Sequence, residues 1–249
     1  MENNEKLKNI AAACIQMDGF FTGDFSVKRK SKKAEISTVA PSSSAEPTEM
    51  PEVSSDSAAG LAKIADRVRK CRKCEIGSTR LNAVPGDGSP TARLVFVGEA
   101  PGADEDEQGL PFVGRSGQLL EKMIIAMGLT RQSVFICNTI KCRPPENRDP
   151  KPDEIANCMP YLQRQLAAIR PEIIVALGAH AAKTLLDTDK PIGQVRGQFH
   201  EYRFSDDFPP AKLMPTYHPS YLLRNYSDDN RRRVWEDLQK VMQELGLKK

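Results

Sequence analysis

The chain has 249 residues and a net charge of +3, with 36 Lys and Arg against 33 Asp and Glu. This length is enough for one α/β domain with a sizeable core plus tails, and the mild basic excess is compatible with a polyanionic partner. No apolar run approaches the roughly 18 residues of a membrane span, and residues 10–15 are too short a run for a signal-peptide core. We therefore exclude a membrane protein and expect a cytoplasmic monomer.

Residues 1–58 have the composition of a tail and linker. Residues 37–58 are rich in Ser, Pro, Ala and Glu and contain no aromatic residue. Such a segment cannot bury enough apolar surface to offset the entropy of ordering. We expect this region to be mostly disordered, with a short amphipathic helix near residues 5–17.

Residues 59–249 alternate strand-like and helix-like patterns. Compact apolar runs, typical of buried parallel strands, cover residues 94–97, 134–137, 173–177 and 213–217. Helical apolar stripes lie between and after them, as at residues 119–127 and 155–169. The pattern predicts an α/β fold, a three-layer α/β/α sandwich with a central parallel four-stranded sheet. We expect the fourth run to be an edge strand, because Pro215 lacks a ladder donor.

The first of these strands ends in a sharp turn, residues 98–102. Ligands of open parallel sheets bind in the loops that follow the carboxyl ends of the strands. Glu99 is therefore expected at the mouth of a cleft. Four consecutive acidic residues follow, 104–107. We interpret them as a solvated loop or the start of a helix, because consecutive acids cannot all face one pair of metal ions.

Four cysteines have spacing typical of a metal centre: Cys71, Cys74, Cys142 and Cys158. A C-x2-C turn presents two thiolates to one centre, and two distant cysteines complete a tetrahedral set. The spacing alone does not distinguish zinc from a [4Fe–4S] cluster. Either centre would be structural, because protein would fill all four positions. Of the others, Cys14 lies in the tail and Cys137 is expected to be a small core residue.

Several motifs, taken in order, resemble the family 4 uracil-DNA glycosylases, the iron–sulfur branch of that superfamily. They are GEAPG at residues 98–102, GLPFVGRSG at 109–117, NTIKCRPPENR at 138–148 and HPS at 218–220, together with the four cysteines. The resemblance covers about residues 60–247. It implies a parallel four-stranded sheet between helices, a [4Fe–4S] cluster rather than zinc, and hydrolysis of the bond between uracil and deoxyribose in DNA.

The resemblance implies a role for each strand-end residue. Glu99 would hold the attacking water, and His218 would stabilise the departing uracil anion. Asn138 would read the base, since a side-chain amide offers both a donor and an acceptor. Phe112 would be the stacking surface, and Asn147 would help to hold water or substrate.

The same motifs imply further contacts to uracil-containing DNA. The remaining predicted substrate-binding residues are Gly98, Ala100, Gly102, Ser220 and Leu223. Leu222 or Leu223 would be the wedge that fills the vacated base stack. Arg143, Arg148 and Arg224 are candidates for phosphate contacts. In the tail, residues 16–21 (QMDGFF) resemble peptides by which bacterial DNA-repair proteins bind the sliding clamp, which makes the clamp a candidate partner.

Three other functions remain open from the sequence. The first is a protein that binds uracil-DNA without turnover, the second a metal-dependent nuclease that uses residues 104–107. The third is a zinc-stapled or cluster-stapled nucleic-acid-binding module without chemistry. The position that excludes the thymine methyl in family 1 enzymes falls at Gly102, so the basis of thymine rejection is not visible in the sequence.

Overall fold

The computed structural model describes residues 55–247 of the chain. The helices are α2 (Ser55–Lys70), α3 (Ile76–Thr79), α4 (Ala103–Gln108), α5 (Arg115–Ala126), α6 (Pro152–Ile169), α7 (Ala179–Leu186), α8 (Ile192–Val195), α9 (Pro219–Arg224) and α10 (Asp228–Glu244), with 3-10 turns η1 (Arg131–Ser133) and η2 (Pro145–Asn147). The strands are β1 (Asp87–Gly88), β2 (Leu94–Gly98), β3 (Phe135–Asn138), β4 (Ile173–Leu177), β5 (His200–Tyr202) and β6 (Ala211–Thr216).

The strands form one sheet in the order β1-β3-β2-β4-β6-β5. Strands β3, β2, β4 and β6 run parallel, as the apolar runs predicted. The prediction of four strands was wrong, because short antiparallel strands close both edges, β1 beside β3 and β5 beside β6. Neither edge strand has an apolar run long enough to stand out in the sequence.

The expectation that β6 is an edge strand was also wrong. Strand β5 pairs with β6 from Ala211 to Leu213 and does not extend to Pro215. Beyond the end of β5, the Pro215 carbonyl accepts a hydrogen bond from the Gly197 N–H at 3.1 Å. The proline therefore lies where its missing N–H interrupts no ladder, and β6 is an inner strand.

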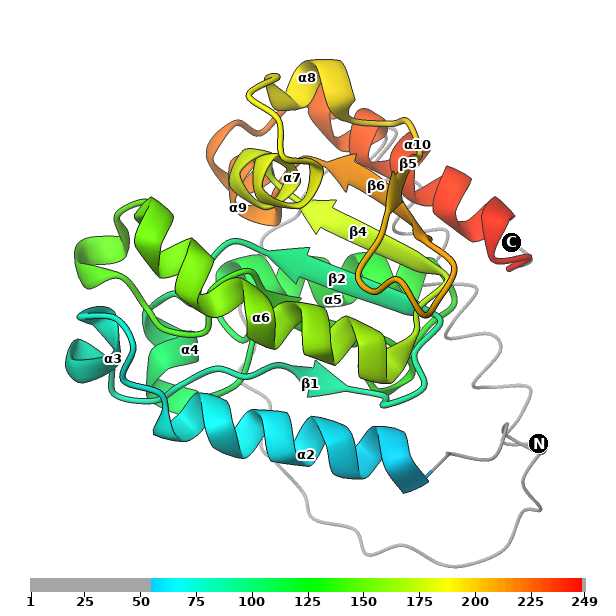
Figure 1. Cartoon of the computed structure of the whole chain (residues 1–249). Helices are drawn as coiled ribbons and strands as arrows, with labels where there is room; N and C mark the ends of the chain where they lie inside the picture. Colours follow the sequence, from blue (N-terminus) through cyan, green and yellow to red (C-terminus); the bar gives the residue numbers. More distant parts are fainter. Residues whose placement is uncertain (1–54, 248–249) are drawn as a thin grey trace, which may run out of the picture.

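The sheet lies between two layers of helices (Figure 1). Side chains alternate along β2, so that Phe96 packs with α5, α9 and α10, and Val97 packs with α6 and α7 on the opposite face. Helix α2 lies beside α6 at the β1 edge of the sheet (Figure 1), and this contact contributes a third, smaller core. The predicted α/β/α sandwich is confirmed.

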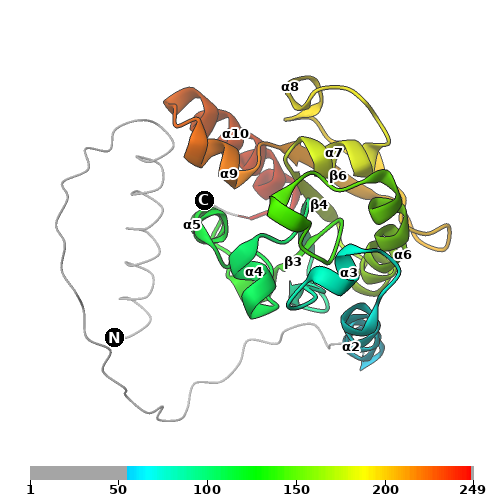
Figure 2. The ribbon, with the colours of Figure 1, turned by 90° about the vertical axis from the view of Figure 1, so that its left-hand side faces the viewer.

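The carboxyl ends of the parallel strands face the viewer in Figure 2. At this end Gly98 of β2 stands beside Asn138 of β3. Past the ladder, the Glu99 carbonyl accepts from the Ile140 N–H at 3.1 Å and from the Thr139 hydroxyl at 2.6 Å. These bonds fix the loops after β2 and β3 against each other, so that residues from two distant motifs share one edge.

Several predictions concern residues that lie wholly or partly outside the described range. The amphipathic segment near residues 5–17, the clamp-like residues 16–21 and most of the predicted linker fall there, whereas residues 55–58 belong to α2. Among the described residues, no helix combines the length and apolar character that crossing a bilayer requires.

Candidate active site

A cavity of about 690 Å³ opens at the carboxyl ends of the parallel strands. Its walls come from the loops after β2, β3, β4 and β6, as the strand-end rule predicts. The predicted site residues that line it are Glu99, Ala100, Gly102, Phe112, Asn138, Asn147, His218 and Ser220. Gly98 and Leu223 do not line it.

Asn138 ends β3 and is buried, with 2% of its surface exposed. Its Oδ1 atom has no hydrogen-bond partner, although buried polar atoms are rarely left unpaired. Gly98 permits this position, because a Cβ atom there would lie 2.4 Å from Asn138 Oδ1. Gly98 is thus part of the site without lining it. The oxygen is thus an acceptor that the described part of the chain leaves unused.

Phe112 forms the neighbouring wall of the cavity. Its backbone has a φ of +52°, which strains a non-glycine residue. The strained turn is packed tightly, because a Cβ on Gly117 would lie 1.9 Å from the Phe112 carbonyl oxygen, and Arg131 donates to that carbonyl at 3.2 Å. The Phe112 ring lies 5.6 Å from the His218 ring, centroid to centroid. The turn therefore presents a fixed aromatic face beside the imidazole.

His218 is the N-cap of α9. Its Nδ1 atom accepts from the Ser220 backbone N–H at 3.1 Å and lies 2.8 Å from the Ser220 hydroxyl. Burial lowers the pKa of His218 to about 4, and the charge of Arg224 acts in the same direction. The ring is therefore neutral near pH 7, and because Nδ1 accepts, Nε2 carries the proton. This leaves a single N–H donor for the cavity.

Glu99 lies at the turn after β2, half-buried beside two other titratable groups. Its carboxylate, the carboxylate of Asp149 and the ring of His180 have atoms within 4.8 Å of one another. Burial raises the pKa of Glu99, His180 opposes this effect and Asp149 adds to it. His180 belongs to no motif in the sequence. The strand-end rule that selected Glu99 applies to it as well, since it follows β4.

The loop after β3 is fixed by a buried ion pair. Glu154 of α6 accepts from Arg148 through both carboxylate oxygens, at 2.6 and 2.9 Å, and from the Lys151 N–H at 2.8 Å. The hydrogen bond from Arg148 holds the pKa of Glu154 below its usual range. Asn147, at the cavity wall, accepts from Arg143 Nε at 2.9 Å. Arg148 and Arg143 thus shape this loop.

The acidic stretch 104–107 lies in helix α4, as the interpretation of a helix start predicted, and two of its acids have backbone partners. Glu105 accepts from the N–H groups of Val113 and Gly114 at 2.9 and 3.0 Å, and from Gly102 at 3.0 Å. It joins the turn after β2 to the turn that carries Phe112. Asp106 is 4% exposed and accepts from the backbone of residues 81 and 82. The sequence showed a run of charge but not these partners.

The two leucines of α9 differ in exposure. Leu222 is 1% exposed and packs in the core, whereas Leu223 is 38% exposed. Leu222 is therefore not available as a wedge. Arg224, the last residue of the same helix, lines the cavity.

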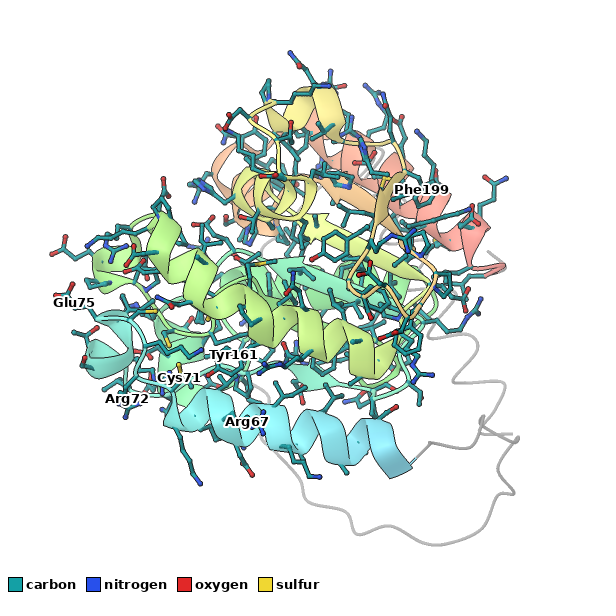
Figure 3. All side chains as sticks on the ribbon, viewed as in Figure 1. Arg67, Cys71, Arg72, Glu75, Tyr161 and Phe199 are labelled. Atoms are coloured by element: carbon teal, nitrogen blue, oxygen red, sulfur yellow. The ribbon has the colours of Figure 1, made fainter. Side chains whose placement is uncertain are left out.

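The four predicted ligand cysteines lie together, beside the cavity, in the small core under α2 and α6. Figure 3 shows Cys71 at the end of α2, near Tyr161 of α6. Cys142 and Cys158 are buried, and Cys71 and Cys74 are half-buried. Cys137 lies apart in the main core, 1% exposed, as expected.

One cation and one backbone N–H group donate to sulfurs of this cysteine centre. Arg80 donates to Cys142 Sγ at 2.8 Å, and the Lys141 backbone N–H donates to Cys158 Sγ at 3.3 Å. Burial raises the pKa of Cys158 to about 11, and the charge of Lys141 opposes this effect. Within residues 55–247, no three cysteine sulfurs lie within 4.8 Å of one another, whereas zinc bonds of about 2.3 Å bring four sulfurs to about 3.8 Å. Four cysteine side chains gathered in one place are a donor set that suits a metal–sulfur centre.

Residues 85–239 match the family model of the uracil-DNA glycosylase superfamily, and the chain belongs to that superfamily. It is similar to the type-4 uracil-DNA glycosylase of Saccharolobus solfataricus, with 46% identity over 76% of this chain and 88% of that protein. The type-4 enzyme of Thermotoga maritima is 46% identical over 72% of this chain and 91% of that protein. The type-4 enzyme of Archaeoglobus fulgidus is 44% identical over 76% of this chain and 94% of that protein. The resemblance found in the motifs is confirmed.

Proposed function

We propose that this chain is a uracil-DNA glycosylase, which hydrolyses the N-glycosidic bond of deoxyuridine in DNA, releases free uracil and leaves an abasic site. One observation carries this most directly: Asn138, whose side-chain oxygen has no partner, lines the same cavity as Glu99 and His218. The similarity to type-4 uracil-DNA glycosylases supports the substrate and the reaction.

Asn138 is the base reader. Its Oδ1 atom, which lacks a partner in the protein, accepts from uracil N3–H while the amide N–H donates to uracil O4. Cytosine presents an acceptor at N3 and a donor at C4, the opposite pattern. With cytosine bound, the Asn138 oxygen would face an acceptor and its N–H group would face a donor. Such a mismatch lowers the reaction rate by orders of magnitude.

His218 stabilises the departing base. As the glycosidic bond breaks, negative charge spreads over the uracil ring, and the Nε2–H donor of the neutral imidazole is available to bond O2. The ring orientation is set before the reaction, because Ser220 bonds the opposite nitrogen. A donor that is already oriented stabilises the anion without reorganisation.

Glu99 holds the attacking water and favours the positive charge that develops on the sugar. Burial raises the pKa of Glu99 and Asp149 adds to this effect, while His180 opposes it. Asn147, on the same cavity wall, assists in holding water or substrate.

The target nucleotide leaves the base stack, because a base inside a duplex cannot reach a closed cavity. Phe112 stacks on the flipped base, while Gly98, Ala100 and Gly102 form the turn beneath it. Leu223, exposed on α9, is the wedge that fills the vacated stack. Arg224, at the cavity rim, contacts phosphate.

The four cysteines hold a structural [4Fe–4S] cluster. The motif resemblance to the iron–sulfur branch and the similarity to type-4 enzymes support a cluster over a single zinc ion. The cluster ties the end of α2 to the loop after β3 and to α6, and so fixes the wall that carries Asn147. The sliding clamp stays a proposed partner through residues 16–21, and the functional unit we propose is a monomer.

The test is incubation with an oligonucleotide that contains one uracil, followed by hot alkali and by detection of free uracil. Wild-type protein should release uracil and yield strand scission at that position. Glu99→Gln and His218→Gln should each lower the single-turnover rate at least about a hundredfold, while Glu107→Gln, an exposed acid on α4, should not. Binding without release would leave only a uracil-DNA-binding protein, and full activity in both site variants would refute these roles.

A further inference from the structure

Lys141 is the most deeply buried basic side chain that the structure describes, with 1% of its surface exposed. Within residues 55–247 it makes no ion pair, and its ammonium has one hydrogen bond, to the Asn138 carbonyl at 2.7 Å. A buried ammonium without a counter-charge is unfavourable, because burial removes its hydration. Some negative charge close to Lys141 is therefore needed to account for its position.

The cysteine centre provides that charge. The Lys141 backbone N–H donates to Cys158 Sγ, and the next residue in the chain is Cys142. A centre held by four thiolates is anionic. Lys141 precedes one of its ligands in the chain and contacts another through its backbone, so this centre is the source of negative charge that the structure offers to the ammonium.

The same side chain contacts the backbone of a residue that lines the uracil cavity. The Asn138 carbonyl that accepts from Lys141 belongs to a residue that lines the cavity and whose side-chain oxygen has no partner. The Lys141 carbonyl in turn accepts from the Val84 N–H at 2.8 Å, so the lysine backbone is fixed on both sides. Lys141 alone, among the described residues, bonds both a cysteine ligand and the base-reading residue.

We propose that Lys141 is a positioning residue that couples the cluster to uracil recognition: its ammonium is the counter-charge of the cysteine centre, and its hydrogen bond fixes Asn138. The inference rests on the glycosylase activity and the cluster proposed above. It assigns to the cluster an effect on base reading in addition to the stapling of loops.

The test compares two variants that each remove one positive charge beside the cluster. Lys141→Met keeps the volume of the side chain and loses both the charge and the bond to Asn138. Arg80→Gln, the matched control, loses the cation at Cys142 but has no contact with the uracil cavity. Iron content, the reduction potential by protein-film voltammetry, and kcat and KM on a uracil oligonucleotide are measured for both.

Removing a cation disfavours the added electron, so both variants should have a more negative potential than wild type. Only Lys141→Met should raise KM, by roughly tenfold, the effect of one lost charge-assisted hydrogen bond. A loaded Lys141→Met protein with wild-type KM or wild-type potential would overturn the inference. If Lys141→Met does not retain iron, the Lys141→Arg variant is measured instead. Restored iron content with a restored KM supports the role of the charge. Loss of iron from Lys141→Arg as well would mean that Lys141 acts only through packing, and would overturn the inference.

These outcomes are distinguishable from failure of the proposed function. Wild-type protein that releases no uracil, or carries no iron, refutes the glycosylase or the cluster itself. Active, iron-containing wild type beside an equally active Lys141→Met refutes only the coupling.

Discussion

The neutral state of His218 predicts a specific dependence of stability on pH. Burial lowers the pKa of this imidazole from an ordinary 6.5 to about 4 in the folded protein. The unfolded chain therefore binds a proton near pH 6.5, and the folded protein binds it only near pH 4. Between these values the unfolded chain carries more protons, so the free energy of unfolding falls as the pH decreases.

The size of this effect follows from the two pKa values. A difference between 6.5 and about 4 corresponds to about 3 kcal/mol, lost as the pH falls from 6.5 to about 4, with no further change above pH 6.5. His218→Gln is neutral throughout and lacks this contribution. The assay is urea unfolding of both proteins at a series of pH values between 4 and 8, on protein with its metal centre intact.

The wild-type protein should lose about 3 kcal/mol more than His218→Gln between pH 7 and pH 4. The carboxylates are common to both proteins, so their contributions cancel in the difference. Parallel curves for the two proteins would refute the neutral imidazole, and with it the assignment of a preset Nε2–H donor.

Three other predictions concern the cavity walls. Asn138→Ala should lower single-turnover uracil excision at least about a hundredfold, yet change the free energy of unfolding by less than about 1 kcal/mol, because Oδ1 has no partner to lose. The excision assay and chemical denaturation measure these two effects. A large loss of stability would contradict the assignment. Gly98→Ala places a Cβ 2.4 Å from Asn138 Oδ1 and 2.6 Å from Phe112 Cζ, so it should destabilise the protein by about 1–3 kcal/mol and raise KM for uracil DNA, whereas Gly193→Ala, with open space around it, should do neither. Glu105→Gln weakens the acceptor of three backbone N–H groups and should cost about 2 kcal/mol of stability together with a lower kcat/KM; an unchanged thermal midpoint would argue against a fastening role.

The sequence predicted the features that depend on local pattern. The apolar runs at β2, β3, β4 and β6 and the helical stripe of α6 follow from β-branched content and apolar periodicity. The meeting of Glu99, Asn138 and His218 in one cavity follows from a topological rule, that parallel strands end at one edge.

What the sequence could not show depends on partners chosen in three dimensions. The strands β1 and β5 are defined by their neighbours rather than by their own composition. Glu105 is one acid among four until Gly102 and Val113 are seen to donate to it. Likewise, the roles of His180 and Lys141 are visible only in the structure, which places His180 beside Glu99 and Lys141 beside Asn138.

The central claim is that one cavity presents a carboxylate, an amide and a neutral imidazole to a single flipped uracil. The most direct test is the crystal structure of Glu99→Gln, slowed in turnover, bound to single-stranded DNA that contains deoxyuridine. The account predicts uracil between the Phe112 ring and the turn after β2, with the Asn138 amide bonded to N3–H and O4, and His218 Nε2 bonded to O2. A uracil that remains stacked in the DNA, or that occupies another face of the protein, would contradict it.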